Sequence, residues 1–137
     1  LAIPRVSTVI DMINALAWCG LGEYKNAPRA KPKLLQQFHS QGYVDALKSI
    51  EMSQMVNAFE RQKYNIGTLS NPVFTEMFQR PATSVGSSIL AAELVAGGGR
   101  AYALGGGLHH CMATHANGFC VLNDLVFAIS ASALSGN

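Results

Sequence analysis

The sequence is poor in charge and lacks long apolar runs. Charged residues make up 13% of the 137 residues and the net charge is only +2. A balance so close to neutral, with Lys25, Arg29, Lys31 and Lys33 confined to one short segment, argues against nucleic-acid binding. No apolar stretch approaches the ~20 residues of a membrane span, so no membrane partner is expected. With hydrophobic residues at 49%, part of the surface is expected to be apolar.

Cysteine is also scarce. Cys19, Cys111 and Cys120 are odd in number and follow no disulfide or zinc-finger spacing, which predicts reduced thiols in a cytoplasmic protein. The chain begins at Leu1 rather than Met, and no basic and then apolar leader precedes its first helical pattern. We therefore expect it to start inside a longer sequence.

Apolar residues recur at helical spacing in several segments, which predicts four to six helices. Residues Pro4 to Trp18 and Pro81 to Ala96 carry the pattern well, and a last helix runs from Val121 to about Ala133. Two shorter helices follow Pro32 and are expected to be separated by Gly42, and a weaker helical pattern covers residues 51–63. The stripe of Met52, Met55 and Phe59 in that last pattern is interpreted as packing, with a ligand surface as the less favoured alternative.

One segment favours a strand. Residues Arg100 to Leu104 are short, apolar and bounded by glycine runs, which is typical of a buried strand. His109 and His110 follow soon after, so they are expected at the carboxyl end of that strand, where ligands usually bind. Imidazole titrates near neutrality and can transfer protons to and from a substrate. By themselves, however, two histidines in a glycine loop more often have a surface or structural role.

A metal site built from the same region is a weaker alternative. It would use His109, His110, Cys111, His115 and Cys120. Adjacent histidines cannot easily both turn toward one tetrahedral ion, so this interpretation is not favoured. The cysteines are expected to be small buried residues, and His39 a structural residue at a helix end near backbone carbonyls.

The wider sequence around the two histidines resembles the zinc-dependent histone deacetylases and the bacterial acetoin-utilisation proteins. Residues 105–124 read GGGLHHCMATHANGFCVLND, with the family's spacing from the histidine pair to Gly118-Phe119 and on to Asn123-Asp124. Further similarities lie upstream, in Ile3-Pro4-Arg5, Leu34-Leu35, Phe38-His39, Tyr43, Tyr64-Asn65 and Asn71-Pro72-Val73-Phe74. The resemblance covers nearly the whole chain.

The resemblance implies roles for four residues. His109 would steady charge at a metal-bound water, and His110 would be the general base and acid. Gly118 and Phe119 would line the narrow channel that admits an acetyl-lysine-like chain. The reaction of such enzymes is zinc-assisted hydrolysis of an amide.

The chain also departs from the family it resembles. The family's metal ligands come from segments that would follow residue 137, so no metal ligand and no cofactor are expected within this chain. The carboxylates that orient the histidine pair would lie there too. Ser70 stands where many relatives carry a loop aspartate that grips the substrate backbone.

These observations predict a single partial deacetylase-like domain over residues 1–137. Its fold is expected to be α/β, a helix-rich truncated remnant of the arginase/deacetylase fold with one or two short strands. The favoured function is a truncated deacetylase-like protein without activity of its own, its histidines vestigial, which self-assembles into a homo-oligomer through the apolar surfaces that truncation is expected to expose. The alternative is part of a zinc-dependent amidohydrolase acting on acetyl-lysine or acetylpolyamine-like substrates once the missing segment is supplied.

Overall fold

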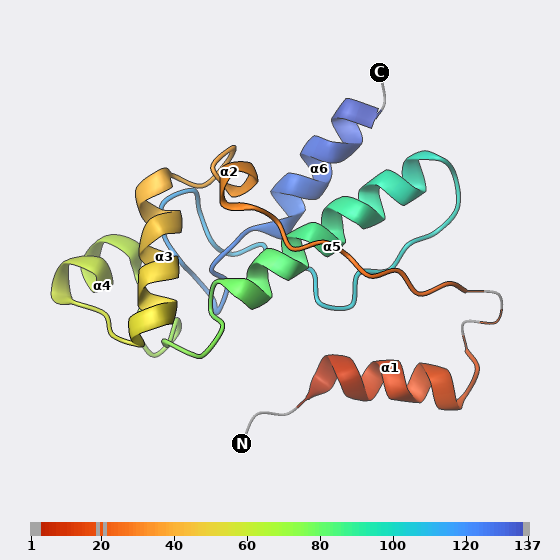
Figure 1. The fold of residues 1–137 in the computed structure, drawn as a ribbon, viewed down its shortest axis with the longest axis horizontal. Helices are drawn as coiled ribbons and strands as arrows, with labels where there is room; N and C mark the ends of the chain where they lie inside the picture. Colours follow the sequence, from red (N-terminus) through yellow and green to blue (C-terminus); the bar gives the residue numbers. More distant parts are fainter. Residues whose placement is uncertain (1–3, 19, 21, 136–137) are drawn as a thin grey trace.

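The computed structural model describes residues 4–18, 20 and 22–135, and this part of the chain is almost entirely helix and loop (Figure 1). The helices are α1 (Arg5–Ala15), α2 (Pro32–Leu35), α3 (Gln41–Ser53), α4 (Ala58–Tyr64), α5 (Gln79–Ala96) and α6 (Asp124–Ser135). The expected helix-rich fold is confirmed. The predictions for Ile3 and Cys19 fall outside the described residues.

The hydrophobic core forms where α3 meets α2, α5 and the loop that leads into α6. Its largest fully buried apolar side chains are Leu35, Tyr43, Leu47, Ile50, Ile66, Met77 and Leu122. Helices α5 and α6 pack against each other and lie side by side in Figure 1. Burial of this apolar surface, at roughly 25 cal/mol per Å², is the main force that holds the loops of the site in place.

Helix α1 lies apart from this core, below it in Figure 1, and none of its residues is buried. Its apolar side chains Val6, Val9 and Met12 are exposed, as is Leu16 directly after it. The predicted helix is therefore present, but its apolar face has no cover within the described residues.

The predicted strand from Arg100 to Leu104 is not formed. The segment is irregular, and the side chain of Tyr102 is 84% exposed. A buried strand needs neighbouring strands to pair its backbone groups. In the described part of the chain the β-structure consists of one isolated bridge, between Asn117 and Cys120, so residues 100–104 have no strand to pair with.

Two further expectations about the first half of the chain are wrong. Gly42 lies inside α3 instead of separating two helices, and a Cβ there would lie 3.2 Å from the Tyr64 hydroxyl oxygen, so glycine allows α3 and residue 64 to approach closely. Met52 near the end of α3, Met55 in the loop after it and Phe59 in α4 are all exposed, with Met52 at 87%. Their stripe is surface and not core.

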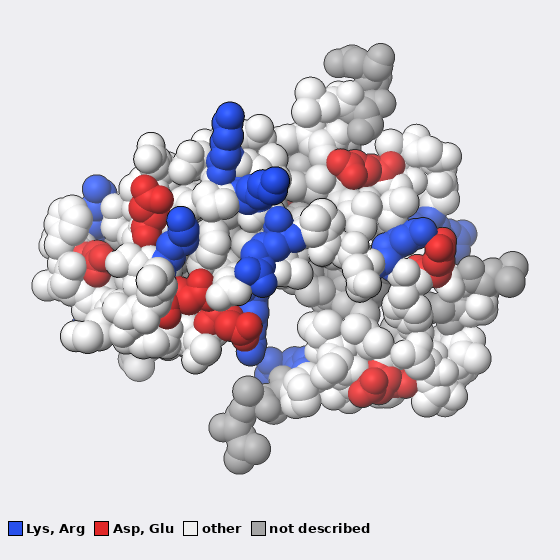
Figure 2. Space-filling view, viewed as in Figure 1, with Lys and Arg blue, Asp and Glu red and all other residues white. Residues whose placement is uncertain are grey.

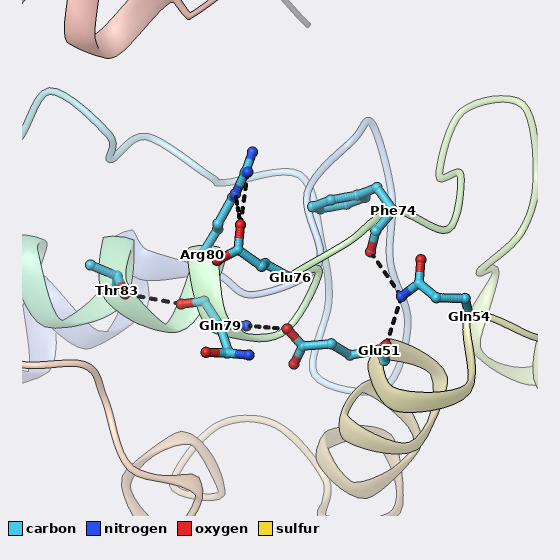
Figure 3. A network of polar contacts seen from close by, with 7 residues as sticks. All are labelled: Glu51, Gln54, Phe74, Glu76, Gln79, Arg80 and Thr83. Atoms are coloured by element: carbon cyan, nitrogen blue, oxygen red, sulfur yellow. Dashed lines mark hydrogen bonds and ion pairs between the residues drawn. The ribbon is translucent and has the colours of Figure 1, made fainter.

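Polar contacts join the end of α3 to the start of α5 (Figure 3). Gln54 adopts a left-handed conformation that ends α3, and its side-chain amide donates to the carbonyls of Glu51 at 2.6 Å and Phe74 at 3.5 Å. The Glu51 carboxylate in turn accepts the Gln79 backbone N–H at 3.4 Å. These contacts connect the end of α3 to the segment that leads into α5.

The chain segment before α2 crosses α5 at very short range. Ala30 donates its backbone N–H to the Ala82 carbonyl at 3.0 Å. A Cβ built on Gly86 would lie only 1.8 Å from the carbonyl oxygen of Pro28, so the crossing requires glycine at this position. The segment and the helix are thereby held in contact along one turn of α5.

Charged groups are unevenly spread over the face drawn in Figure 2. Lysine and arginine side chains gather near α2 and the segment that leads into it, while large areas carry neither sign of charge. Helix α6 has one charged residue, Asp124. No described helix is both long and apolar enough to cross a membrane.

Candidate active site

A buried carboxylate organises the glycine loop before the histidine pair. Asp124, the first residue of α6, is fully buried. Its Oδ1 accepts the Leu108 backbone N–H at 2.6 Å and its Oδ2 accepts the Gly107 backbone N–H at 2.9 Å. The Ser88 hydroxyl of α5 donates to the same Oδ2. Charge-assisted bonds of this kind are stronger than neutral ones, so the loop is firmly attached to α5 and α6.

His109 and His110 leave this loop together, and both are exposed. Their ring centroids lie 4.0 Å apart with a tilt of 46° between the planes. His109 Nδ1 lies 2.9 Å from the Gly107 carbonyl oxygen. Because a carbonyl only accepts, Nδ1 carries the proton in that contact, and Nε2 of neutral His109 keeps its lone pair.

Asn123, the N-cap of α6, holds the backbone on the other side of the pair. Its side-chain amide donates to the carbonyls of Cys111 at 3.1 Å and His109 at 3.4 Å. Its carboxamide oxygen accepts the Val126 backbone N–H at 3.3 Å. One side chain thus starts the helix and fixes the loop.

Behind Asn123 lies the buried imidazole of His39. Its Nε2 accepts the Asn123 backbone N–H at 3.1 Å, and the rings of Phe38, Tyr43 and Phe127 surround it. Burial lowers the pKa of His39 to about 4, against opposing contributions from the Ala113 and Met112 carbonyls. His39 is therefore neutral near pH 7, and the expected structural role near carbonyls agrees with its position.

Gly118 and Phe119 form a turn that faces the pair. Gly118 has a φ of +53°, and a Cβ on it would lie 3.0 Å from Cβ and Cγ of His110, so the imidazole packs directly over this glycine. Phe119 donates its backbone N–H to the Ser70 carbonyl at 3.0 Å and to the Asn71 side chain at 3.1 Å. Phe119 as a whole is 71% exposed.

The structure thus brings together three of the residues predicted from the sequence, His109, His110 and Gly118, and Phe119 follows Gly118 in the same turn. It also adds residues that the sequence reasoning did not assign to the site: Asn71, Ser88, Asn123 and Asp124. Asn71, Asn123 and Asp124 belong to motifs of the sequence that assign them no role. Ser88 gave no signal, because a serine within a helix has many other possible uses.

The donor groups near the pair do not fit a zinc ion. The residues that the structure describes contain no group of three or more His, Cys, Asp or Glu side chains that could hold a metal. Cys111 and Cys120 are buried free cysteines, and burial, followed by the nearby Cys120, raises the pKa of the Cys111 thiol to about 12. A thiol that resists deprotonation is a poor zinc ligand.

The arrangement of the two histidines suits proton transfer. Two exposed imidazoles stand at the end of a loop that is hydrogen-bonded on both sides, and a glycine with positive φ leaves room for the second ring. Held imidazoles of this kind can take a proton from water and return it to a leaving group.

The sequence profile of a family described as "Histone deacetylase domain" matches residues 2–136. The acetoin utilization protein AcuC of Bacillus subtilis is 32% identical over 127 residues, which cover 91% of this chain and 33% of that protein. Histone deacetylase RPD3 of Saccharomyces cerevisiae is 35% identical over 117 residues, which cover 80% of this chain and 27% of the yeast protein.

The fold is also similar to that of solved histone deacetylase homologues. The crystal structure of a histone deacetylase homologue from Aquifex aeolicus superimposes with a TM-score of 0.85 at 34% identity, covering 98% of this chain and 36% of that one. A homologue complexed with SAHA gives the same values. The chain spans about a third of the length of these relatives.

Proposed function

This chain belongs to the histone deacetylase domain family, and on that basis we propose that it supplies the proton-transfer histidines and one wall of the substrate channel of an amide-hydrolysing deacetylase. The observation that carries the proposal is the double anchoring of the histidine loop, by Asp124 before the pair and by Asn123 after it. Precise placement of acid–base groups is what such catalysis needs.

The two histidines take different parts in this proposal. The contact of His109 with the Gly107 carbonyl leaves its Nε2 free to accept a hydrogen bond from the attacking water. His110, against Gly118, removes the proton of that water and later protonates the leaving amine. Phe119, exposed and next in sequence to Gly118, contributes apolar surface for the methylene chain of an acetylated amine such as acetyl-lysine or an acetylpolyamine.

The family is zinc-dependent, and zinc supplies polarisation of the amide carbonyl and of water in such enzymes. The described residues do not form a set of zinc ligands. Both imidazoles are also open to bulk solvent, whereas hydrolytic sites gain from the exclusion of water. We therefore propose that residues 1–137 by themselves do not turn over acetylated amines.

A replacement experiment tests the roles of the histidines. In Bacillus subtilis AcuC, the segment that matches this chain is replaced by residues 2–136 of this chain. Hydrolysis of an acetyl-lysine peptide and of an acetylated diamine by this hybrid protein, the AcuC replacement, is then measured. The exchange is expected to retain hydrolysis, and His110→Ala to lower kcat by about 10²–10⁴-fold. His115→Ala, in the same loop, is the control and is expected to change kcat little. Full activity of the His110→Ala replacement contradicts the proposal.

The isolated chain tests the second part. It is assayed with the same substrates in the presence of added zinc, and no turnover above the blank is expected. Turnover that disappears in the His110→Ala variant would show that these residues form a complete site.

Self-association is a second candidate property, favoured by exposed apolar side chains on two helices. Ile129 and Leu134 of α6 and Val6 and Met12 of α1 are exposed. Burying such surface between copies is favourable, so we propose a homo-oligomer formed through these faces.

A further inference from the structure

The backbone around the histidine pair is held by two consecutive residues on opposite sides. Asp124 accepts the backbone N–H groups of Gly107 and Leu108, which precede the pair. Asn123 donates to the carbonyls of His109 and Cys111, which flank His110. The path of the chain through both histidines is therefore fixed by the start of a single helix, α6.

We infer that Asn123 and Asp124 are positioning residues for the proposed proton transfer: they set the directions of the two imidazoles, and the carboxylate of Asp124 is needed as an acceptor on both of its oxygens. This inference rests on the proposed function of the pair. Neither residue touches substrate in this assignment, because Asp124 is fully buried and Asn123 is buried.

The requirement for a carboxylate follows from the donors that surround Asp124. Oδ1 faces one backbone N–H, and Oδ2 faces a second backbone N–H and the Ser88 hydroxyl. An asparagine at this position has one oxygen and one NH₂ group. Whichever way its amide turns, one backbone N–H of the loop meets another donor and loses its acceptor. Buried donors without acceptors are strongly disfavoured, so the loop would shift.

The space around the carboxylate is closed as well. A Cβ on Gly106 would lie 2.7 Å from Asp124 Oδ2 and 2.8 Å from Ser88 Oγ. The loop therefore lies directly over the carboxylate, and no room remains for a larger group or for a displaced side chain.

Asn123 is held from behind by His39, which accepts its backbone N–H. The hydrogen bonds run from a buried imidazole in the segment before α3, through Asn123, to the carbonyls beside His110. A side chain that only capped α6 would need its oxygen alone. The two hydrogen bonds from the Asn123 NH₂ group to the loop are additional to the cap. They hold the histidine loop, whereas the side-chain oxygen caps α6.

The test uses the 137-residue chain and the ring ¹H–¹⁵N NMR signals of its histidines. Asp124→Asn and Asn123→Ser are compared with the unchanged chain, since serine keeps a good N-cap but lacks the NH₂ donors. Both variants are expected to move the ring signals of His109 and His110 and to leave that of His115 in place. Helix content is checked by circular dichroism.

A matched control comes from the other asparagine cap. Asn57 accepts the Glu60 backbone N–H at 2.8 Å and caps α4, away from the histidines. Asn57→Ser makes the same chemical change and is expected to leave both ring signals unmoved. If Asp124→Asn does not fold, Ser88→Ala is used in its place. This variant removes one of the three donors to Asp124, and it is expected to move the ring signals of His109 and His110 in the same direction but by less.

The inference is overturned if the ring signals of His109 and His110 stay unmoved in two variants. These are Asn123→Ser and folded Asp124→Asn, or Ser88→Ala in place of the latter. In the AcuC replacement, Asn123→Ser is expected to lower kcat by about 10–100-fold with KM little changed. The two claims fail separately. If the ring signals move in the variants but the AcuC replacement shows no turnover that depends on His110, the positioning inference stands and the proposed function is rejected. If the AcuC replacement shows turnover that depends on His110 but the ring signals do not move, the proposed function stands and the positioning inference is rejected.

Discussion

The imidazole of His110 packs against the backbone of Gly118. A side chain at residue 118 would begin 3.0 Å from Cβ and Cγ and 3.1 Å from Cδ2 of His110, closer than ordinary contact. The φ of +53° at Gly118 further favours glycine. Residue 118 therefore limits where the ring of His110 can lie.

Gly118→Ala is expected to displace the His110 ring and to lower stability. The left-handed backbone alone costs about 1–2 kcal/mol for a non-glycine residue. Gly20 provides a matched control, because its φ is +52° and no atom lies within 4 Å of a Cβ placed there. Urea unfolding of the two alanine variants compares them. A larger loss at residue 118, with a moved His110 ring signal, is expected; equal losses would mean that the ring accommodates the methyl group.

Gly86→Ala is expected to destabilise the protein although it lies within a helix. Helix propensity alone predicts a gain of about 1 kcal/mol for this change. The Cβ would, however, lie 1.8 Å from the Pro28 carbonyl oxygen, so the segment must move away from α5. Overpacking of this kind costs about 1–3 kcal/mol or more. A lowered urea midpoint is the expected result, and a raised midpoint would contradict the close crossing.

His39 is expected to make stability depend on pH below neutrality. Its pKa is about 4 in the folded chain against 6.5 for an unperturbed histidine, mainly because of burial. The unfolded chain therefore binds more protons between these values, and the free energy of unfolding rises with pH across that range. The contribution is complete above pH 6.5 and is lost progressively toward pH 4, reaching about 3 kcal/mol in total.

Unfolding by urea at pH 7 and pH 5 measures this effect. His39→Phe is expected to be less stable at pH 7, because the Asn123 N–H loses its acceptor, but to change less between the two pH values. The same slope in both proteins would mean that His39 is not the residue responsible.

The proposed self-association is tested on α6. Ile129, whose side chain is 68% exposed, is changed to lysine, which places a charge in the middle of the apolar face. Light scattering at micromolar concentration is expected to show an oligomer for the unchanged chain and a smaller mass for Ile129→Lys. A monodisperse monomer for the unchanged chain rejects the proposal.

The helices could be predicted from the sequence because their apolar periodicity is local. Leu47 and Ile50 mark the buried face of α3, and Val85 and Ala92 that of α5. The strand at residues 100–104 could not be judged in the same way, since an apolar run forms a strand only where neighbouring strands can pair with it. Local pattern also failed for Met52, which continues a helical stripe but is exposed in the structure.

Some features of the candidate site could likewise be predicted from the sequence, and others could not. The positions of His109, His110, Gly118 and Phe119 followed from a motif. The contacts that hold them did not, because Ser88 and Asp124 lie 36 residues apart, and Asn123 and His39 lie 84 apart. No spacing rule links residues so distant in the chain.

Those long separations have a consequence for folding. The Tyr43 hydroxyl donates to the Val121 carbonyl across 78 residues, close to the His39 to Asn123 contact across 84. Closing loops of this length has an entropic cost that local helices such as α3 and α5 do not have. Contacts of high sequence separation are the slow step in small domains. We therefore expect the helices to form first and the histidine pair to reach its final orientation only when the two ends of the core have met, so that His110 reports the end of folding.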